Sequence, residues 1–250
     1  MNGLLKTGAA AQAAAEEYEK KVIASSGPRR FFLNKPSGDP QDTNNSALIT
    51  FLDGVVGADG LLEMPPSMLE HQINHNGSWD HHYACIAADG PCPLCEQRKD
   101  NPSYCSYFTI INHTGYKDGK DGWKQKGQNR KAIFVAKSKT MKILQHLATT
   151  HGTLRGLTVQ ATRLDGAPNV GGIFEHKKTQ TDKAEFVAMC GGGEVDMSPI
   201  NYGEVLNFLT AAQMVEAGLV NPTHTVGGAA APVNNSVSPS GTPGAAPEPF

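Results

Sequence analysis

Residues 68–95 of the chain read MLEHQINHNGSWDHHYACIAADGPCPLC, and this stretch combines a strand–turn–strand pattern with a run of metal-ligating side chains. The residues from Met68 to Asn74 and from His81 to Ala87 are strand-like, and Asn76-Gly77 lies between them. Asn-Gly between two strand-like runs is typical of a tight hairpin turn. The stretch therefore predicts a β-hairpin, and it favours a mainly β fold around that hairpin.

Three of the five cysteines lie within eleven residues, which indicates metal binding rather than disulfides. Cys92 and Cys95 have the spacing that lets one turn direct two sulfurs at a tetrahedral ion, and Cys85 supplies a third. A structural zinc site needs a fourth ligand. Hairpin pairing brings His71 close to Cys85, whereas strand alternation puts His82 on the opposite face from Cys85. We therefore expect one structural zinc ion held by His71, Cys85, Cys92 and Cys95, with His82, His81, His75 and Cys105 as the other candidates for the fourth position.

Two other interpretations of the cysteines remain open. Cys92 and Cys95 can form a redox pair, but such a pair usually opens a helix in a βαβ unit, and this stretch lies between predicted strands. Pro91, Cys92 and Cys95 also match half of the zinc-deaminase signature. The His-x-Glu half, which supplies the general acid/base, is absent upstream. We therefore expect no enzymatic activity, and a zinc-dependent deaminase or nuclease is the least favoured function.

Further strands are expected on both sides of the hairpin, and they are Arg29–Leu33, Ala47–Leu52, Tyr104–Asn112, Lys131–Lys137, Leu154–Leu164, Ile173–Lys177 and Glu185–Met189. A helix is predicted from about Ser138 to Gly152, with Ser138 and Gly152 as its caps, and another from about Asn201 to Ala217. The first of these helices lies between the third and fourth expected barrel strands. This is the arrangement of an OB-fold, a barrel that often binds single strands. We expect a mainly β (α+β) fold with an OB-like barrel, a zinc-binding hairpin subdomain, a C-terminal helix and a disordered tail.

The 250 residues suit one folded core with tails. We expect an N-terminal helix or arm over residues 1–27, an OB-like DNA-binding core over 28–220 with the zinc subdomain at about 67–100, and a disordered tail over 221–250. Residues 223–250 are mostly Ala, Gly, Pro, Ser, Thr, Val and Asn, a composition that buries little apolar surface. No apolar run of about 18 residues and no signal-like start occur, so we expect a soluble, intracellular protein without a membrane partner.

Net charge is −2, but the charges are distributed unevenly along the chain. Residues 114–142 carry nine Lys or Arg against Asp118 and Asp121, whereas residues 181–250 carry one Lys and seven acidic residues. The loop GYKDGKDGWKQKGQNRK (115–131) interleaves cations with aromatic residues, as single-strand binders do to track phosphates and stack bases. RRFF (29–32) repeats the combination. The predicted DNA-binding residues are Arg29, Arg30, Phe31, Tyr116, Lys117, Lys120, Trp123, Lys124, Lys126, Arg130, Lys131, Lys137 and Lys139. Arg155, Arg163, Lys177 and Lys178 can extend the surface.

The chain ends in Ala246-Pro247-Glu248-Pro249-Phe250. An acidic residue and a terminal Phe after a disordered linker resemble the partner-docking tips of single-stranded-DNA-binding proteins. Glu248 and Phe250 are therefore candidates for contact with replication or recombination proteins. A frayed terminus without a partner is the other interpretation of this segment.

A His-Cys-Cys-Cys order with spacings of 13, 6 and 2 residues, inside a predicted OB-barrel, resembles the zinc-containing, helix-destabilising single-stranded-DNA-binding protein of T4-like bacteriophages. RRFFL (29–33), ITFLDG (49–54), CPLCE (92–96) and FVAKSKT (134–140) also resemble single-strand-binding-like proteins of other tailed phages. The resemblance implies coating of single-stranded DNA, without strong sequence preference, during phage DNA replication, recombination and repair in the cytoplasm of an infected cell. The alternative is a zinc-stabilised structural or adaptor protein that does not bind DNA.

Overall fold

The computed structural model describes residues 28–37, 43–75, 77–98, 101–118, 124–180, 183–192 and 196–221. The expected N-terminal arm and almost all of the expected tail lie outside these residues. The strands are β1 (Arg29–Arg30), β2 (Ser46–Phe51), β3 (Ser67–His75), β4 (Ser78–Ala84), β5 (Ser103–Asn112), β6 (Tyr116–Asp118), β7 (Lys124–Lys126), β8 (Arg130–Ala136), β9 (Leu157–Thr162) and β10 (Ile173–Thr179). The helices are α2 (Pro93–Arg98), α3 (Ser138–His151), α4 (Lys183–Met189), α5 (Tyr202–Val205) and α6 (Ala211–Glu216).

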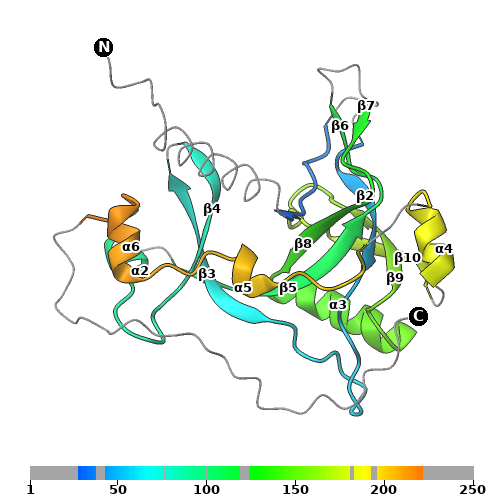
Figure 1. Cartoon of the computed structure of the whole chain (residues 1–250), viewed down its shortest axis with the longest axis horizontal. Coiled ribbons are helices and arrows are strands. Elements are labelled where there is room, and N and C mark those ends of the chain that lie inside the picture. The colour runs from blue at the N-terminus through cyan, green and yellow to red at the C-terminus, as the bar shows by residue number, and fades with distance from the viewer. Residues whose placement is uncertain are drawn as a thin grey trace, which may run out of the picture.

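Eight of these strands form one mixed sheet, and β6 and β7 form a separate pair. The main path runs β1-β8-β5-β2-β9-β10, and β3 joins it by pairing with β5 while also pairing with β4. All pairings are antiparallel except that of β1 with β8. Figure 1 shows the β3–β4 hairpin extending away from the rest of the sheet, with α2 and α6 beside it.

The main hydrophobic core lies inside the curve of this sheet. Phe134 of β8 is fully buried, and its ring contacts Phe31, which follows β1, and Phe174 of β10, with centroids 5.8 and 5.9 Å apart. Phe31 and Phe174, which belong to opposite ends of the strand path, therefore both contact the ring of Phe134. Because a twisted sheet has to roll to bring its ends together, these contacts indicate strong curvature. Between described residues, however, no pairing joins β1 to β10, so the sheet is not a closed barrel.

Helix α3 covers part of this core, where it contributes the buried side chains of Leu144, Leu147 and Ala148. Gly152 ends the helix with φ of +77°, a left-handed conformation that glycine adopts without strain, so the predicted C-cap is confirmed. Ser138 is the first helical residue rather than the N-cap. The N-cap is Lys137, whose side chain makes no capping hydrogen bond.

Two predictions outside the hairpin are wrong. Residues 185–189 belong to helix α4 and not to a strand, and among the α4 side chains only Phe186 is buried. The expected C-terminal helix is divided into α5 and α6 by an extended segment at Leu206. Thr210 starts α6 with a capping box shared with Gln213, which gives the second helix its own beginning. The mainly β class is confirmed. None of the helices in the described part of the chain is long and apolar enough to cross a membrane.

His113 lies in a buried polar cluster at the opposite end of the sheet from the β3–β4 hairpin. Its Nε2 is 2.8 Å from Thr50 Oγ1, its Nδ1 is 2.9 Å from Asn129 Oδ1, and Thr50 Oγ1 is 2.7 Å from Thr158 Oγ1. The ring also packs edge-on against Phe186 of α4. Burial lowers the pKa of His113 below its ordinary value, although the bond to Asn129 acts in the opposite direction. The imidazole is therefore neutral in the folded protein at neutral pH.

Acid is expected to weaken the fold through this histidine. The unfolded chain binds a proton at the ordinary histidine pKa of about 6.5, whereas the folded chain resists protonation, so stability falls as pH drops below that value. Replacing His113 with Gln keeps a hydrogen-bonding side chain and removes the titration. We expect urea melts to show a smaller loss of stability between pH 7 and pH 5 in the variant than in the parent protein. An equal loss in both would contradict the role, and replacing the exposed His146 with Gln is the control.

Candidate functional site

The β3–β4 hairpin and the segment after it bring four ligand atoms together. His71 lies on β3 opposite Tyr83 of β4, and the backbone N–H of Cys85, just after β4, donates to Leu69 O at 2.8 Å. Cys92 immediately precedes helix α2, and Cys95 lies in its first turn. One turn of α2 therefore directs two sulfurs back toward the hairpin, and the hairpin register supplies the other two ligands.

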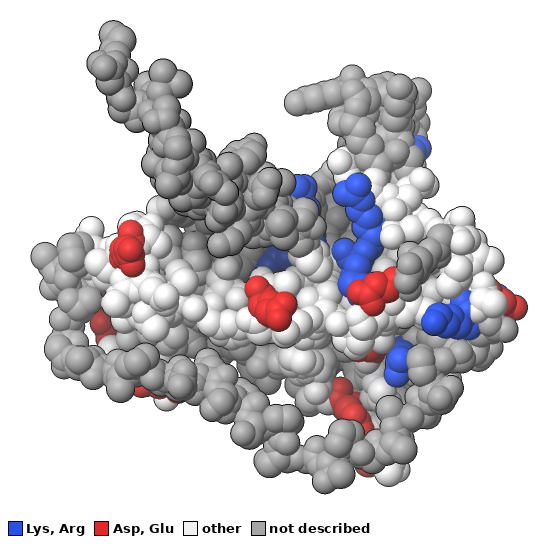
Figure 2. Space-filling view, in the orientation of Figure 1, with Lys and Arg blue, Asp and Glu red and all other residues white. Residues whose placement is uncertain are grey.

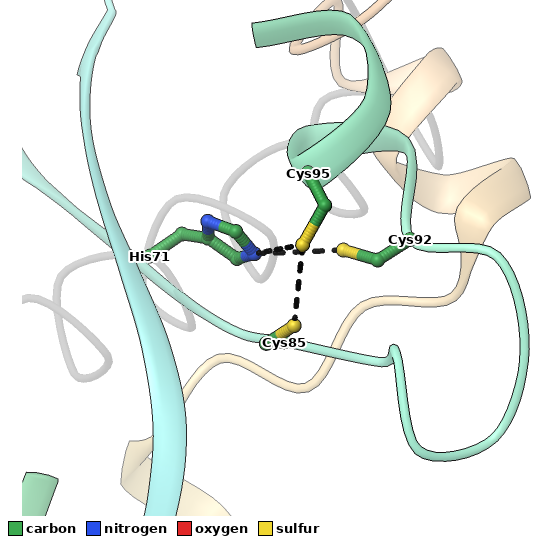
Figure 3. A group of neighbouring side chains, drawn as sticks. All are labelled: His71, Cys85, Cys92 and Cys95. Carbon is green, nitrogen blue, oxygen red and sulfur yellow. Dashed lines mark hydrogen bonds between the residues drawn. The ribbon is translucent and has the colours of Figure 1, made fainter. Parts of the chain in front are cut away.

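The ligand atoms have the spacing of a metal site. His71 Nε2 lies 3.5 Å from Cys92 Sγ and 3.4 Å from Cys95 Sγ, and Cys85 Sγ lies 3.6 Å from Cys95 Sγ (Figure 3). All four atoms are within 4.8 Å of one another. A tetrahedral ion with metal–sulfur bonds of about 2.3 Å and a metal–nitrogen bond of about 2.0 Å has sulfur–sulfur edges of about 3.8 Å and nitrogen–sulfur edges of about 3.5 Å. The group can therefore hold one metal ion.

The electrostatics of the cysteines also suit a cation. Burial raises the pKa of the Cys92 thiol, but backbone N–H groups near its sulfur, including that of Cys95, outweigh burial and lower this pKa. Burial and the neighbouring Cys85 and Cys92 sulfurs raise the pKa of Cys95. Three thiolates at these distances repel one another, and a divalent ion between them removes the repulsion and stabilises the deprotonated form. All five cysteines are free thiols, so the structure contains no disulfide that competes for these sulfurs.

The other candidates for the fourth ligand have different neighbours. His82 Nδ1 is 3.1 Å from Glu70 Oε1, and Cys105 Sγ is 3.9 Å from the same oxygen, on the opposite face of β3 from His71. His75 and His81 pack edge-on against each other, with ring centroids 5.2 Å apart. The grouping of His71 with the three cysteines therefore agrees with the set expected from the sequence.

The C-terminal part of the described chain packs against this centre. Met214 of α6, Leu219 and Val220 share a buried cluster with Ile73, Leu94 and the three cysteines. Arg98 of α2 donates from Nε to Leu219 O at 3.1 Å, and Gln97 exchanges two hydrogen bonds with Asn221. We call the β3–β4 hairpin, residues 85–98 and residues 207–221 the metal module.

Comparison of the chain with protein-family models, with curated proteins and with solved structures returned no match.

A groove of about 950 Å³ lies between the metal module and the curved sheet. Its hairpin side contains Gln72, Asp80 and His82, which alternate along β3 and β4 with the residues that face the metal site. Its sheet side contains five cations and the phenylalanine Phe32, whose side chain is 62% exposed. The cations that line it are Arg29, Arg30, Lys137, Lys139 and Arg163.

The lysines and arginines visible on one face of the molecule gather over the sheet. Figure 2 shows them in the middle and on the right of the view, whereas the metal module on the left carries acidic but no basic side chains on this face. This distribution agrees with the lining of the groove, because its cations come from β1, from the N-cap and first turn of α3, and from the segment after β9.

The structure separates the predicted DNA-binding residues into several groups. Arg29, Arg30, Lys137 and Lys139 line the groove. Phe31 also borders the groove, but it is 4% exposed and stacks on Phe134, so it is mainly a core residue, and Phe32 presents the accessible side chain. Tyr116 and Lys117 lie on β6, Lys124 and Lys126 on β7, and Arg130 and Lys131 on β8, where the Lys131 Nζ donates to Asp196 at 2.6 Å. Lys120, Trp123, Glu248 and Phe250 lie outside the described residues.

Glu70 is a groove residue that the sequence did not indicate. Its side chain is 3% exposed and is hydrogen-bonded by Arg30, His82 and the hydroxyl of Tyr107. Burial raises the pKa of this carboxyl, but the bonds from His82, Arg30 and Tyr107 and the charge of Arg30 outweigh burial and lower it to about 2. Glu70 is therefore an anion at neutral pH. A single Glu among strand residues carries no pattern that distinguishes it from a solvated surface charge.

Proposed function

We propose that this protein binds single-stranded DNA, without strong sequence preference, in the groove between the curved sheet and the metal module. The observation that carries the proposal is the lining of that groove, to which five cations and the exposed residue Phe32 all contribute. Single-strand binders combine cations that follow the phosphates with aromatic rings on which bases stack. Stacking is tolerant of sequence, because every base has a π-face.

The arrangement of the strands supports a relationship to OB-folds. Strands β2, β5 and β8 form an antiparallel meander, α3 follows β8, and β9 returns to pair with β2 before β10 pairs with β9. We propose that these elements form an OB-type core into which the β3–β4 hairpin and α2 are inserted after its first strand. OB-folds bind strands on the face of their second and third strands, which correspond to β5 and β8. Val135 of β8 and Lys137, just after it, line the groove.

We propose zinc as the metal of the His71, Cys85, Cys92 and Cys95 group. Three thiolates and one imidazole form a soft, tetrahedral donor set that suits zinc, and four protein ligands leave no open position for a catalytic water. We therefore propose that the ion is structural and that the protein is not an enzyme. By its resemblance to phage proteins, it acts in DNA replication, recombination and repair in an infected cell. Contact of Glu248 and Phe250 with partner proteins remains part of that proposal.

The test of this function is fluorescence anisotropy of labelled oligo-dT and of a duplex of equal length, titrated with protein at several salt concentrations. We expect binding that weakens with salt and strongly prefers the single strand. Binding to neither nucleic acid at low salt would overturn the proposal and favour the zinc-stabilised adaptor. Equal binding to strand and duplex would restrict the proposal to a general polyanion surface.

Replacing Lys137 and Lys139 together with Gln is expected to reduce the salt dependence of binding. Each phosphate contact in a single strand contributes about 0.7 to the slope of log K against log salt, so the double variant loses about 1.4 if both lysines contact phosphates. The control pair is Lys177 and Lys178 of β10, which are exposed and do not line the groove. A slope equal to that of the parent protein would contradict this role for Lys137 and Lys139.

A further inference from the structure

Glu70 receives hydrogen bonds from side chains on both sides of the groove. Arg30 of β1 donates from Nη1 to Oε1 at 2.9 Å and from Nη2 to Oε2, which is a two-point contact. His82 of β4 lies 3.1 Å from Oε1. Tyr107 of β5, beneath them, donates its hydroxyl to Oε2 at 2.7 Å. One buried carboxylate thus occupies the point where a sheet cation and a hairpin histidine meet.

The two-point contact uses the geometry by which arginine recognises phosphate. A guanidinium presents parallel N–H groups that fit either a carboxylate or a phosphate, and one acceptor in this position excludes the other. Arg30 is also held from one side, because its Cζ lies 5.8 Å from the centroid of the Tyr107 ring. Its side chain remains 24% exposed, so it can reach a strand in the groove only by exchanging Glu70 for a phosphate or by sharing its outer N–H groups.

We propose that Glu70 is a built-in substitute for a backbone phosphate, which occupies Arg30 in the groove and thereby removes one cation from those that bind the strand. This inference rests on the proposed single-strand function and adds its regulation. The groove then binds through Arg29, Lys137, Lys139 and Arg163, while the pair of Arg30 and Glu70 contributes no net charge. Binding is weaker than the number of lining cations indicates, which favours release of the strand.

The experiment compares Glu70→Gln with the parent protein in oligo-dT titrations over a range of salt concentrations. The amide is nearly isosteric and can still accept a bond from Arg30, but it cannot neutralise the guanidinium. We expect tighter binding at low salt and a slope of log K against log salt that is steeper by about 0.7, the contribution of one additional phosphate. Glu175→Gln is the matched control, because it removes the same charge from an exposed position outside the groove.

A second variant keeps the inference testable if Glu70→Gln does not fold. The double replacement Glu70→Gln with Arg30→Gln removes both charges, and we expect it to bind with the parent slope because the pair is masked. A double-variant slope shallower by about 0.7 would show that Arg30 already contacts phosphate and would overturn the inference. Weaker binding or an unchanged slope for a folded Glu70→Gln would overturn it too. Absence of binding by the parent protein would instead remove the proposed function, and this inference with it.

Discussion

Replacing Cys92 with serine is expected to abolish the proposed metal binding and to lower the thermal midpoint by roughly 10 °C or more. The hydroxyl is a poor substitute for a thiolate, and a site that is left with one histidine and two cysteines loses affinity for a thiophilic ion. Because metal binding contributes to the free energy of folding, the loss costs several kcal/mol, and each kcal/mol corresponds to about 2–4 °C in a chain of this size. Ile73, Leu94 and Met214 form a buried cluster with the three cysteines, so we expect this packing to loosen when the metal is lost.

The measurement combines the metal content of the purified protein with thermal melts in the presence and absence of a chelator. We expect one zinc per chain in the parent protein and almost none in Cys92→Ser, with the parent melting like the variant once chelator is added. Cys190→Ser is the matched control, because Cys190 is a partly buried cysteine outside the group. A Cys92→Ser protein with full metal content and an unchanged midpoint would remove Cys92 from the ligand set.

Replacing Phe32 with alanine is expected to weaken oligo-dT binding by about 1–3 kcal/mol, the usual contribution of an aromatic residue that stacks one base. This corresponds to about 5- to 150-fold in affinity. The ring is 62% exposed, so its removal leaves no cavity in the core and the thermal midpoint should stay within a few degrees. Affinity and stability are therefore separable at this position.

Two replacements define the specificity of that effect. Phe208 is 52% exposed and does not line the groove. Phe208→Ala should therefore keep the affinity for oligo-dT within about twofold of the parent value, a smaller change than the loss of one stacked base produces. Phe31→Ala should instead unfold or destabilise the protein by about 3–5 kcal/mol, because it opens a cavity against Phe134. If Phe32→Ala bound oligo-dT as tightly as the parent, the base-stacking ring would lie elsewhere.

The contrast between Phe31 and Phe32 shows where sequence reasoning ends. RRFF identifies two adjacent rings beside two cations, but alternation alone does not say which ring faces the core. That choice depends on the parallel pairing of Arg29 and Arg30 with Ala132 and Ile133, about a hundred residues downstream. The His71 and cysteine group was predictable because a short hairpin fixes the register between the first two ligands and a two-residue spacing fixes the last two.

The wrong helix and strand predictions also have long-range causes. Phe186 and Val187 favour a strand locally, yet the segment forms a helix whose one buried ring packs on His113. The expected C-terminal helix is interrupted beside Asn207, whose carbonyl accepts from Ala84 N at 2.9 Å and whose side chain donates to His82 O at 2.8 Å. The edge of β4 thus exchanges hydrogen bonds, one donated and one accepted, with a segment that the local sequence assigns to a helix.

The packing of residues 207–221 against the metal module has a consequence for the order in which the protein is completed during synthesis. Arg98 contacts Leu219, which lies 121 residues further along the chain. At a translation rate of about 5–20 residues per second, roughly 6–24 s pass between the synthesis of these two residues. The nascent chain therefore presents its cysteine sulfurs and the open edge of β4 for many seconds, without the cover that residues 207–221 later provide. We expect early capture of a metal ion to protect these thiols from oxidation during that interval.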